Sequence, residues 1–186
     1  MFTVNQEYLN VHNILVADVR SALDELRKLD TPFKRRTFVH TLFAFIEGEI
    51  YRRKQVALAI YDAHGVAFSE AEIAMLKEKS YDLDRRGKVT LQQKFLRLEN
   101  NLKFSFDVFA RSFNTKFEIQ LENDNRWESF LKAIEIRNKI THPKNETDLI
   151  ISDTDLEHIQ KAFHWFAESS NELFNIVSAA HERKVA

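Results

Sequence analysis

An arginine, an amide and a histidine lie close together near the end of a predicted helix. Arg137 and Asn138 are followed by His142, and Pro143 comes directly after the histidine. A guanidinium can grip a phosphate through two hydrogen bonds, and an imidazole moves protons near neutral pH. An amide can orient either group, so the three side chains suit metal-free cleavage of a phosphodiester. Arg137, Asn138 and His142 are therefore the candidate catalytic residues.

The helix that carries this motif is predicted to run from Arg126 to about Thr141. Arg137 continues its apolar stripe, where a guanidinium needs an anionic partner or a wet cavity. Pro143 disfavours the helical conformation for the residue before it. His142 is therefore expected to leave the helix and to turn toward Arg137 or toward the same residues of a second subunit. The predicted buried stripe consists of Trp127, Phe130, Leu131 and Ile134.

A second pair of charged residues lies on a long predicted helix that begins at Pro32 and ends near His64. Glu49 precedes Arg53 by four residues, which is the favourable order for a helical ion pair. One interpretation is a satisfied salt bridge in the core or at an interface. The other places Glu49 in the cleft, where it orients Arg137 or His142.

The pattern Arg137-Asn138, three residues and His142, on the penultimate helix of a helical chain, resembles the R-x4-6-H motif of HEPN-domain proteins. In that motif a polar residue, often asparagine, follows the arginine, as Asn138 does. The resemblance implies a helical bundle that dimerises so that both motifs face one cleft. It also implies a metal-independent endoribonuclease of toxin–antitoxin or antiviral type. Arg137 and His142 of two subunits would activate the ribose 2′-hydroxyl and stabilise the phosphorane, leaving a 2′,3′-cyclic phosphate and a 5′-hydroxyl.

Two details qualify this resemblance. HEPN toxins that are neutralised by nucleotidylation carry a tyrosine two residues after the histidine, and Lys144 stands there, so that control is not expected. Arg35 and His40 have the same spacing as the motif. Arg36 follows Arg35 instead of an amide, and nothing breaks the helix after His40, so this second match is interpreted as chance.

The composition favours a single all-α domain over residues 1–186. The chain has 3 Gly and 2 Pro, too few for the turns of a many-stranded sheet. Short connections favour a mostly antiparallel bundle of five to six helices. Residues 65–89 are predicted to be an insertion between two core helices.

The remaining predicted elements follow from periodicity and caps. A first helix is expected from Asn5 to about Leu29, and Ser69 with Glu72 opens a short helix to about Lys79. Residues 80–89 are predicted to be a loop, and Thr90 with Gln93 is the predicted cap of a helix that includes Phe95 and ends near Phe113. Loops are expected at residues 122–125 and 143–148, and a final helix is expected to begin at Ser152 and Asp153.

The charge balance does not by itself indicate a nucleic-acid partner, because the net charge is −1. RNA binding would depend on local basic side chains. The residues expected to steer the phosphate backbone are Lys139, Lys144 and Arg126. The basic cluster of Arg85, Arg86 and Lys88 is interpreted as a solvated surface.

Several other partners and sites are not expected. The sequence has no cysteine and no Gly-rich phosphate loop. Asp155 and His158 have the spacing of a di-iron ligand pair, but that site needs a second copy and two more carboxylates, so neither a metal nor another cofactor is predicted. No secretory signal or membrane-spanning stretch is apparent, which predicts a cytoplasmic protein without a membrane partner. The alternative to a homodimeric ribonuclease with an antitoxin is a non-catalytic helical bundle that binds another protein.

Overall fold

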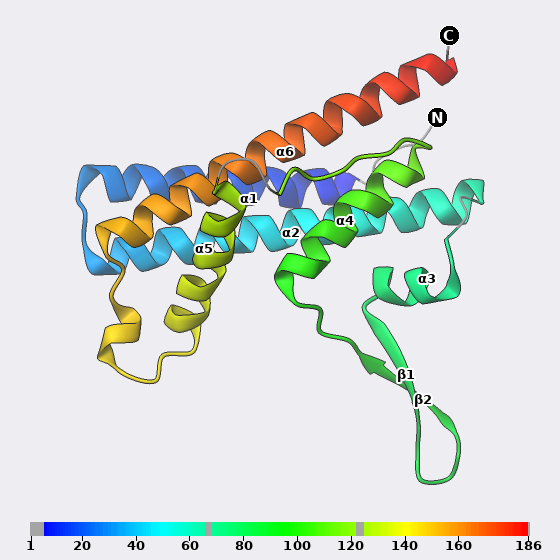
Figure 1. Cartoon of the computed structure of the whole chain (residues 1–186), viewed down its shortest axis with the longest axis horizontal. Helices are drawn as coiled ribbons and strands as arrows, with labels where there is room; N and C mark the ends of the chain where they lie inside the picture. Colours follow the sequence, from blue (N-terminus) through cyan, green and yellow to red (C-terminus); the bar gives the residue numbers. More distant parts are fainter. Residues whose placement is uncertain (1–5, 66–67, 122–124, 186) are drawn as a thin grey trace. The chain divides into compact units, whose positions relative to one another are not determined.

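The computed structural model describes residues 6–65, 68–121 and 125–185, and these residues are mostly helical (Figure 1). This agrees with the helical class predicted from composition. None of the described helices combines the length and apolar character needed to cross a bilayer. In the described residues the α-helices are α1 (Gln6–Lys28), α2 (Pro32–His64), α3 (Glu70–Leu76), α4 (Leu98–Ser112), α5 (Arg126–Thr141) and α6 (Asp153–Val185). A 3-10 helix, η1, spans Glu146–Leu149, and strands β1 (Lys79–Leu83) and β2 (Val89–Gln93) form an antiparallel pair.

Residues at the helix ends explain most of the observed boundaries. Gly65 follows α2 with a φ of 65°, and its N–H donates to the carbonyl of Tyr61 at 2.9 Å. Glycine adopts this left-handed conformation without the strain that a side chain would bring. Ser69 and Glu72 form the predicted capping box at the start of α3. These signals act within about four residues, so the sequence is sufficient to predict them.

The loop predicted for residues 80–89 is wrong, because these residues belong to a β-hairpin. In the paired strands, Tyr81 lies opposite Leu91 and Leu83 lies opposite Val89. The hairpin turns at Gly87, which has a φ of 71°. Apolar side chains alternate with polar ones on both strands, and this period of two indicates β-structure. The alternation is hard to recognise in the sequence because many charged residues surround it.

The predicted start of the fourth helix is also wrong. Thr90 and Gln93 lie in β2, and α4 begins at Leu98 after the N-cap Arg97, whose side chain makes no capping hydrogen bond. Phe95 precedes the helix and is 91% exposed. The hairpin takes up the residues that would have capped the helix, so the helix starts five residues after Gln93. The predicted loop at 122–125 lies largely outside the described residues.

The described chain divides into two compact units, and α2 and α6 contribute residues to both. The motif unit contains residues 6–49, 118–121 and 125–175, and the hairpin unit contains residues 50–65, 68–117 and 176–185. The single domain with an insertion at 65–89 stays a prediction.

In the motif unit, α1 and α2 run antiparallel. Glu25 near the end of α1 meets Lys34 near the start of α2 at 3.3 Å, and His12 near the start of α1 meets Glu49 farther along α2 at 2.7 Å. The α5 helix packs on α6 through Phe130 and Trp165, whose ring centroids are 5.1 Å apart. These contacts anchor the first half of α5. They thereby position its second half, which contains the motif.

In the hairpin unit, a small apolar cluster forms between helices. It contains Ala57, Leu58, Phe68, Leu76 and Val108. Next to it, Lys54 of α2 is fully buried and forms an ion pair with Glu78, the residue before β1. The guanidinium of Arg53 lies 4.2 Å from the ring centroid of Phe106, a cation–π contact.

Candidate functional site

The buried face of α5 differs from the predicted stripe. Of the predicted residues only Phe130 is buried, and Leu131 is 36% exposed. The centre of the buried face is turned by about 120° from the predicted stripe, and this face meets α6 through Phe130 and through smaller residues. Ser129, for example, hydrogen-bonds His158 of α6 at 3.1 Å. The buried residues of α5 are Ser129, Phe130, Ala133, Ile136 and Ile140.

Arg137 lies at the edge of this buried face, and its side chain is 28% exposed. Its Nη2 donates to Oε1 of Glu47 on α2, and its Nη1 donates to Oδ1 of Asn138 at 3.1 Å. The guanidinium therefore has the anionic partner that its position requires. These two contacts, one from each terminal nitrogen, hold the orientation of the planar group.

The carboxylate that reaches Arg137 is Glu47, which the sequence did not single out. Glu49 is buried, and its carboxylate accepts a hydrogen bond from Nδ1 of His12 at 2.7 Å. Residues two apart on a helix point about 200° away from each other, so Glu47 and Glu49 face opposite sides of α2. The carboxylate that contacts Arg137 is thus Glu47, and a role of Glu49 in orienting Arg137 or His142 stays a prediction. The other cleft-lining candidate, Arg53, lies in the hairpin unit.

His142 ends α5 outside the helical conformation, with φ −128° and ψ 60°. This is the change expected from Pro143. The backbone N–H of His142 still donates to the carbonyl of Asn138 at 3.0 Å, which keeps the residue next to the last turn. The residue is exposed, and its imidazole forms no hydrogen bond or ion pair with the part of the chain that is described. The ring is thus accessible to a ligand or to another subunit.

His40 is the second histidine of this region, and the sequence analysis considered it only as a chance match with Arg35. It lies on α2 seven residues before Glu47, two helical turns away on the same face. The residue is exposed, but protein atoms remove part of the water around the imidazole, and this lowers the pKa of His40. The positive charges of Arg137 and Arg36 lower that pKa further. The neutral imidazole is therefore favoured beside the guanidinium of Arg137.

The Arg35 and His40 match does not form a second motif. The guanidinium of Arg35 binds Asp30 and Asp153, at 2.5 Å and 2.6 Å, and the carbonyl of Ile151 at 2.8 Å. These contacts hold Arg35 at the junction of α2 with the start of α6. The signal that could have identified His40 is its seven-residue spacing from Glu47, which places both residues on one face of α2. This spacing indicates a site only when α5 is known to pack against that face.

The pH dependence of His40 gives a test of this arrangement. Because folding lowers the pKa of His40 below its ordinary value of 6.5, the unfolded chain binds the proton more tightly. The contribution to stability is therefore present above pH 6.5 and is lost as the pH falls through the folded pKa. We expect Arg137→Gln to raise the pKa of His40, because one of the neighbouring positive charges is removed, while desolvation still keeps this pKa below 6.5. A pH titration of the imidazole resonances by NMR measures the change. An unchanged pKa would mean that the two side chains are not neighbours in solution.

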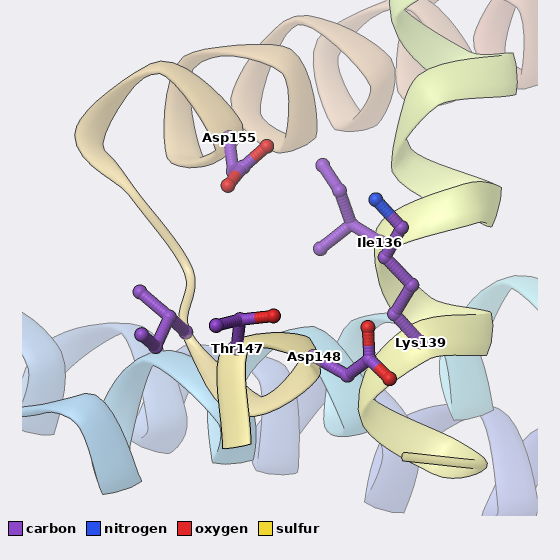
Figure 2. A pocket seen from close by; sticks show the side chains of 6 residues that line it. Ile136, Lys139, Thr147, Asp148 and Asp155 are labelled. Carbon is purple, nitrogen blue, oxygen red and sulfur yellow. The ribbon is translucent and has the colours of Figure 1, made fainter. Parts of the chain in front are cut away.

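The three basic residues expected to steer RNA are not gathered around Arg137. Lys139 lines a pocket of about 280 Å³ with the carboxylates of Asp148 and Asp155, between α5, η1 and the start of α6 (Figure 2). The backbone N–H of Lys144 donates to Asp148 at 2.8 Å. Arg126 pairs with Glu168 at the other end of α5, about 16 Å along the helix from Arg137. Only Lys139 and Lys144 are thus on the same helix end as the motif.

The described residues bring together the guanidinium of Arg137, the amide of Asn138, the carboxylate of Glu47 and the imidazole of His40, and His142 follows at the end of α5. Within residues 6–65, 68–121 and 125–185, no group of three or more histidine, aspartate or glutamate side chains could hold a metal ion. The guanidinium and the amide can bind an anion, and an imidazole can move a proton. Comparisons of the chain with models of protein families, with curated proteins and with solved structures give no match.

Proposed function

We propose that the chain is a HEPN-like, metal-independent endoribonuclease. The observation that carries the proposal is the fixed guanidinium of Arg137 next to Asn138, one turn before the exposed imidazole of His142. An arginine that served only to cap the helix would have its donors on the terminal carbonyls. Arg137 instead faces Glu47, and its remaining N–H groups have no partner among the described residues, which leaves them able to bind an anion.

The chemistry follows from the donors that are left. A guanidinium has five N–H donors, and the contacts with Glu47 and Asn138 use two of them. The other donors can hold two oxygens of a scissile phosphate and stabilise the charge that accumulates on the phosphorane. Cleavage also needs an acceptor for the proton of the 2′-hydroxyl and a donor for the leaving 5′-oxygen. In the proposed homodimer, the His142 imidazoles of two subunits fill these roles, one neutral and one protonated.

The proposed reaction balances without a further reactant. The 2′-oxygen forms a bond to phosphorus as one imidazole takes its proton. The bond from phosphorus to the 5′-oxygen then breaks, and the second imidazole supplies a proton to that oxygen. The products are a 2′,3′-cyclic phosphate and a 5′-hydroxyl. The biological setting that we propose with this activity is a toxin or antiviral effector held inactive by a protein partner.

The proposal is tested by incubating purified protein with total cellular RNA in EDTA. Wild type is expected to produce cyclic phosphate ends, identified by end-group analysis, and His142→Ala is expected to produce none. Equal cleavage by both proteins would exclude His142 from the site. Absence of cleavage by both, also with added structured and unstructured RNA, would favour the non-catalytic interaction module.

The dimeric form of the site has its own test. Arg137→Gln and His142→Ala are each expected to be inactive alone. If both His142 imidazoles act in one shared site, a heterodimer of wild type with His142→Ala lacks one of them and is inactive. Excess His142→Ala mixed with wild type is therefore expected to lower the activity to that of the few remaining wild-type homodimers. Undiminished wild-type activity in a mixture shown to contain heterodimers would contradict the shared site.

A further inference from the structure

The hairpin arm, residues 79–94, has one apolar face that is open to solvent. Tyr81 pairs across the strands with Leu91, and Leu83 pairs with Val89, so the four side chains lie on the same face. They are 54–69% exposed, and Phe95 follows them at 91%. A two-stranded hairpin is only marginally stable in water, and clustered exposed apolar side chains mark binding surfaces. This face therefore has the character of a ligand-binding surface.

The hairpin arm is also the basic part of the chain. It holds five basic and two acidic residues, a net charge of +3 in a chain of net charge −1, which leaves −4 for all other residues. Both acidic side chains are turned onto backbone N–H groups of the arm. Asp82 accepts from Leu83 at 2.8 Å, and Asp84 accepts from Arg86 at 2.8 Å and from Lys88 at 2.9 Å. The ligand that complements this surface is therefore anionic.

The basic groups stand at both ends of the arm. Lys79 and Lys94 lie at its base, and Arg85, Arg86 and Lys88 lie in the turn, which Figure 1 shows at the far end of the strands. Each strand has five residues, which corresponds to about 16 Å. No described residue forms an ion pair with Arg85, Arg86 or Lys88. The apolar face lies between two groups of positive charge.

We infer that the hairpin arm binds single-stranded RNA, with bases against Tyr81 and its apolar neighbours and phosphates near the basic side chains. RNA carries a charge at every nucleotide with a flat base beside it, which fits an apolar face with positive charge at both ends. A second hairpin arm would bring +3 against +3, so pairing of two hairpin arms is disfavoured. Duplex RNA is disfavoured because its deep, narrow major groove excludes such an arm.

This surface goes beyond the proposed cleavage site. The hairpin arm belongs to the hairpin unit, while Arg137 and His142 belong to the motif unit. Binding to 2′-O-methyl RNA, which has no 2′-hydroxyl to react, separates the two proposals, since the arm can bind this RNA whether or not the motif cleaves.

The experiment measures fluorescence anisotropy of a labelled, mixed-sequence 2′-O-methyl RNA of about 12 nucleotides with wild-type protein in EDTA. Wild type is expected to bind, with a salt dependence typical of phosphate contacts. The triple variant Arg85→Gln, Arg86→Gln, Lys88→Gln is expected to lower the slope of log affinity against log salt by about 2. Tyr81→Ser is expected to weaken binding about tenfold through lost stacking.

The matched control removes the same charge elsewhere. Arg20→Gln, Arg27→Gln, Lys161→Gln changes exposed residues of the motif unit and is expected to bind as wild type does. Circular dichroism establishes that all variants fold. Equal losses in the two triple variants would overturn the inference, as would tighter binding to duplex DNA of the same length. A wild type that binds no RNA at low salt would also overturn it.

Discussion

Replacing Arg137 with glutamine is expected to slow RNA cleavage by about 100-fold or more. The guanidinium is held by Glu47 and Asn138, so its free donors point in a fixed direction. Glutamine lacks both the positive charge and the second pair of donors, and the phosphorane would lose its largest stabilising contact. The measurement is the initial rate on a defined single-stranded RNA, with saturation curves that separate kcat from KM.

Two matched variants separate charge from geometry. Arg137→Lys keeps the charge but loses the planar fork, and we expect it to recover less than about a tenth of the wild-type rate. Arg27→Gln removes an arginine from α1 whose side chain is 71% exposed, and its rate should equal that of wild type. Wild-type activity in Arg137→Gln would exclude the guanidinium from the reaction and would leave it as a structural partner of Glu47.

Replacing Glu78 with glutamine is expected to lower the free energy of unfolding by about 3 kcal/mol. The side chain of Lys54 has no exposed area, and its ammonium is paired with the Glu78 carboxylate, which is 28% exposed. Removing the carboxylate leaves a buried positive charge without its counter-ion. The expected loss in the free energy of unfolding is at the lower end of the range for buried ion pairs, because Glu78 retains contact with water. Urea denaturation followed by circular dichroism measures the change.

The controls use the same chemical change and its compensation. Glu172→Gln alters an exposed residue within α6 and is expected to change stability by less than about 0.5 kcal/mol. The double variant Lys54→Met, Glu78→Gln removes both charges and is expected to regain most of the loss. If Glu78→Gln costs no more than Glu172→Gln, the buried ion pair does not stabilise the hairpin unit.

Local signals in the sequence were sufficient for most of the helices. Pro32 and Gly65 delimit α2, and Ser69 with Glu72 starts α3, because proline, a left-handed glycine and a capping box act on residues within one turn. The same reasoning placed His142 outside α5. The β-hairpin was missed because its apolar residues are exposed and stand among charged ones, so their alternation indicates no buried face.

The surroundings of Arg137 depended on tertiary structure alone. The sequence required an anion for the guanidinium, but Glu47 and Glu49 were both available, and the choice depends on how α2 is rotated about its axis. That rotation is set by packing against residues distant in sequence, and Glu47 is 90 residues from Arg137. His40 joins the site for the same reason. The sequence by itself thus determined the motif and the helix end that presents it, whereas the packing of α2 determined which carboxylate and which second imidazole lie beside it.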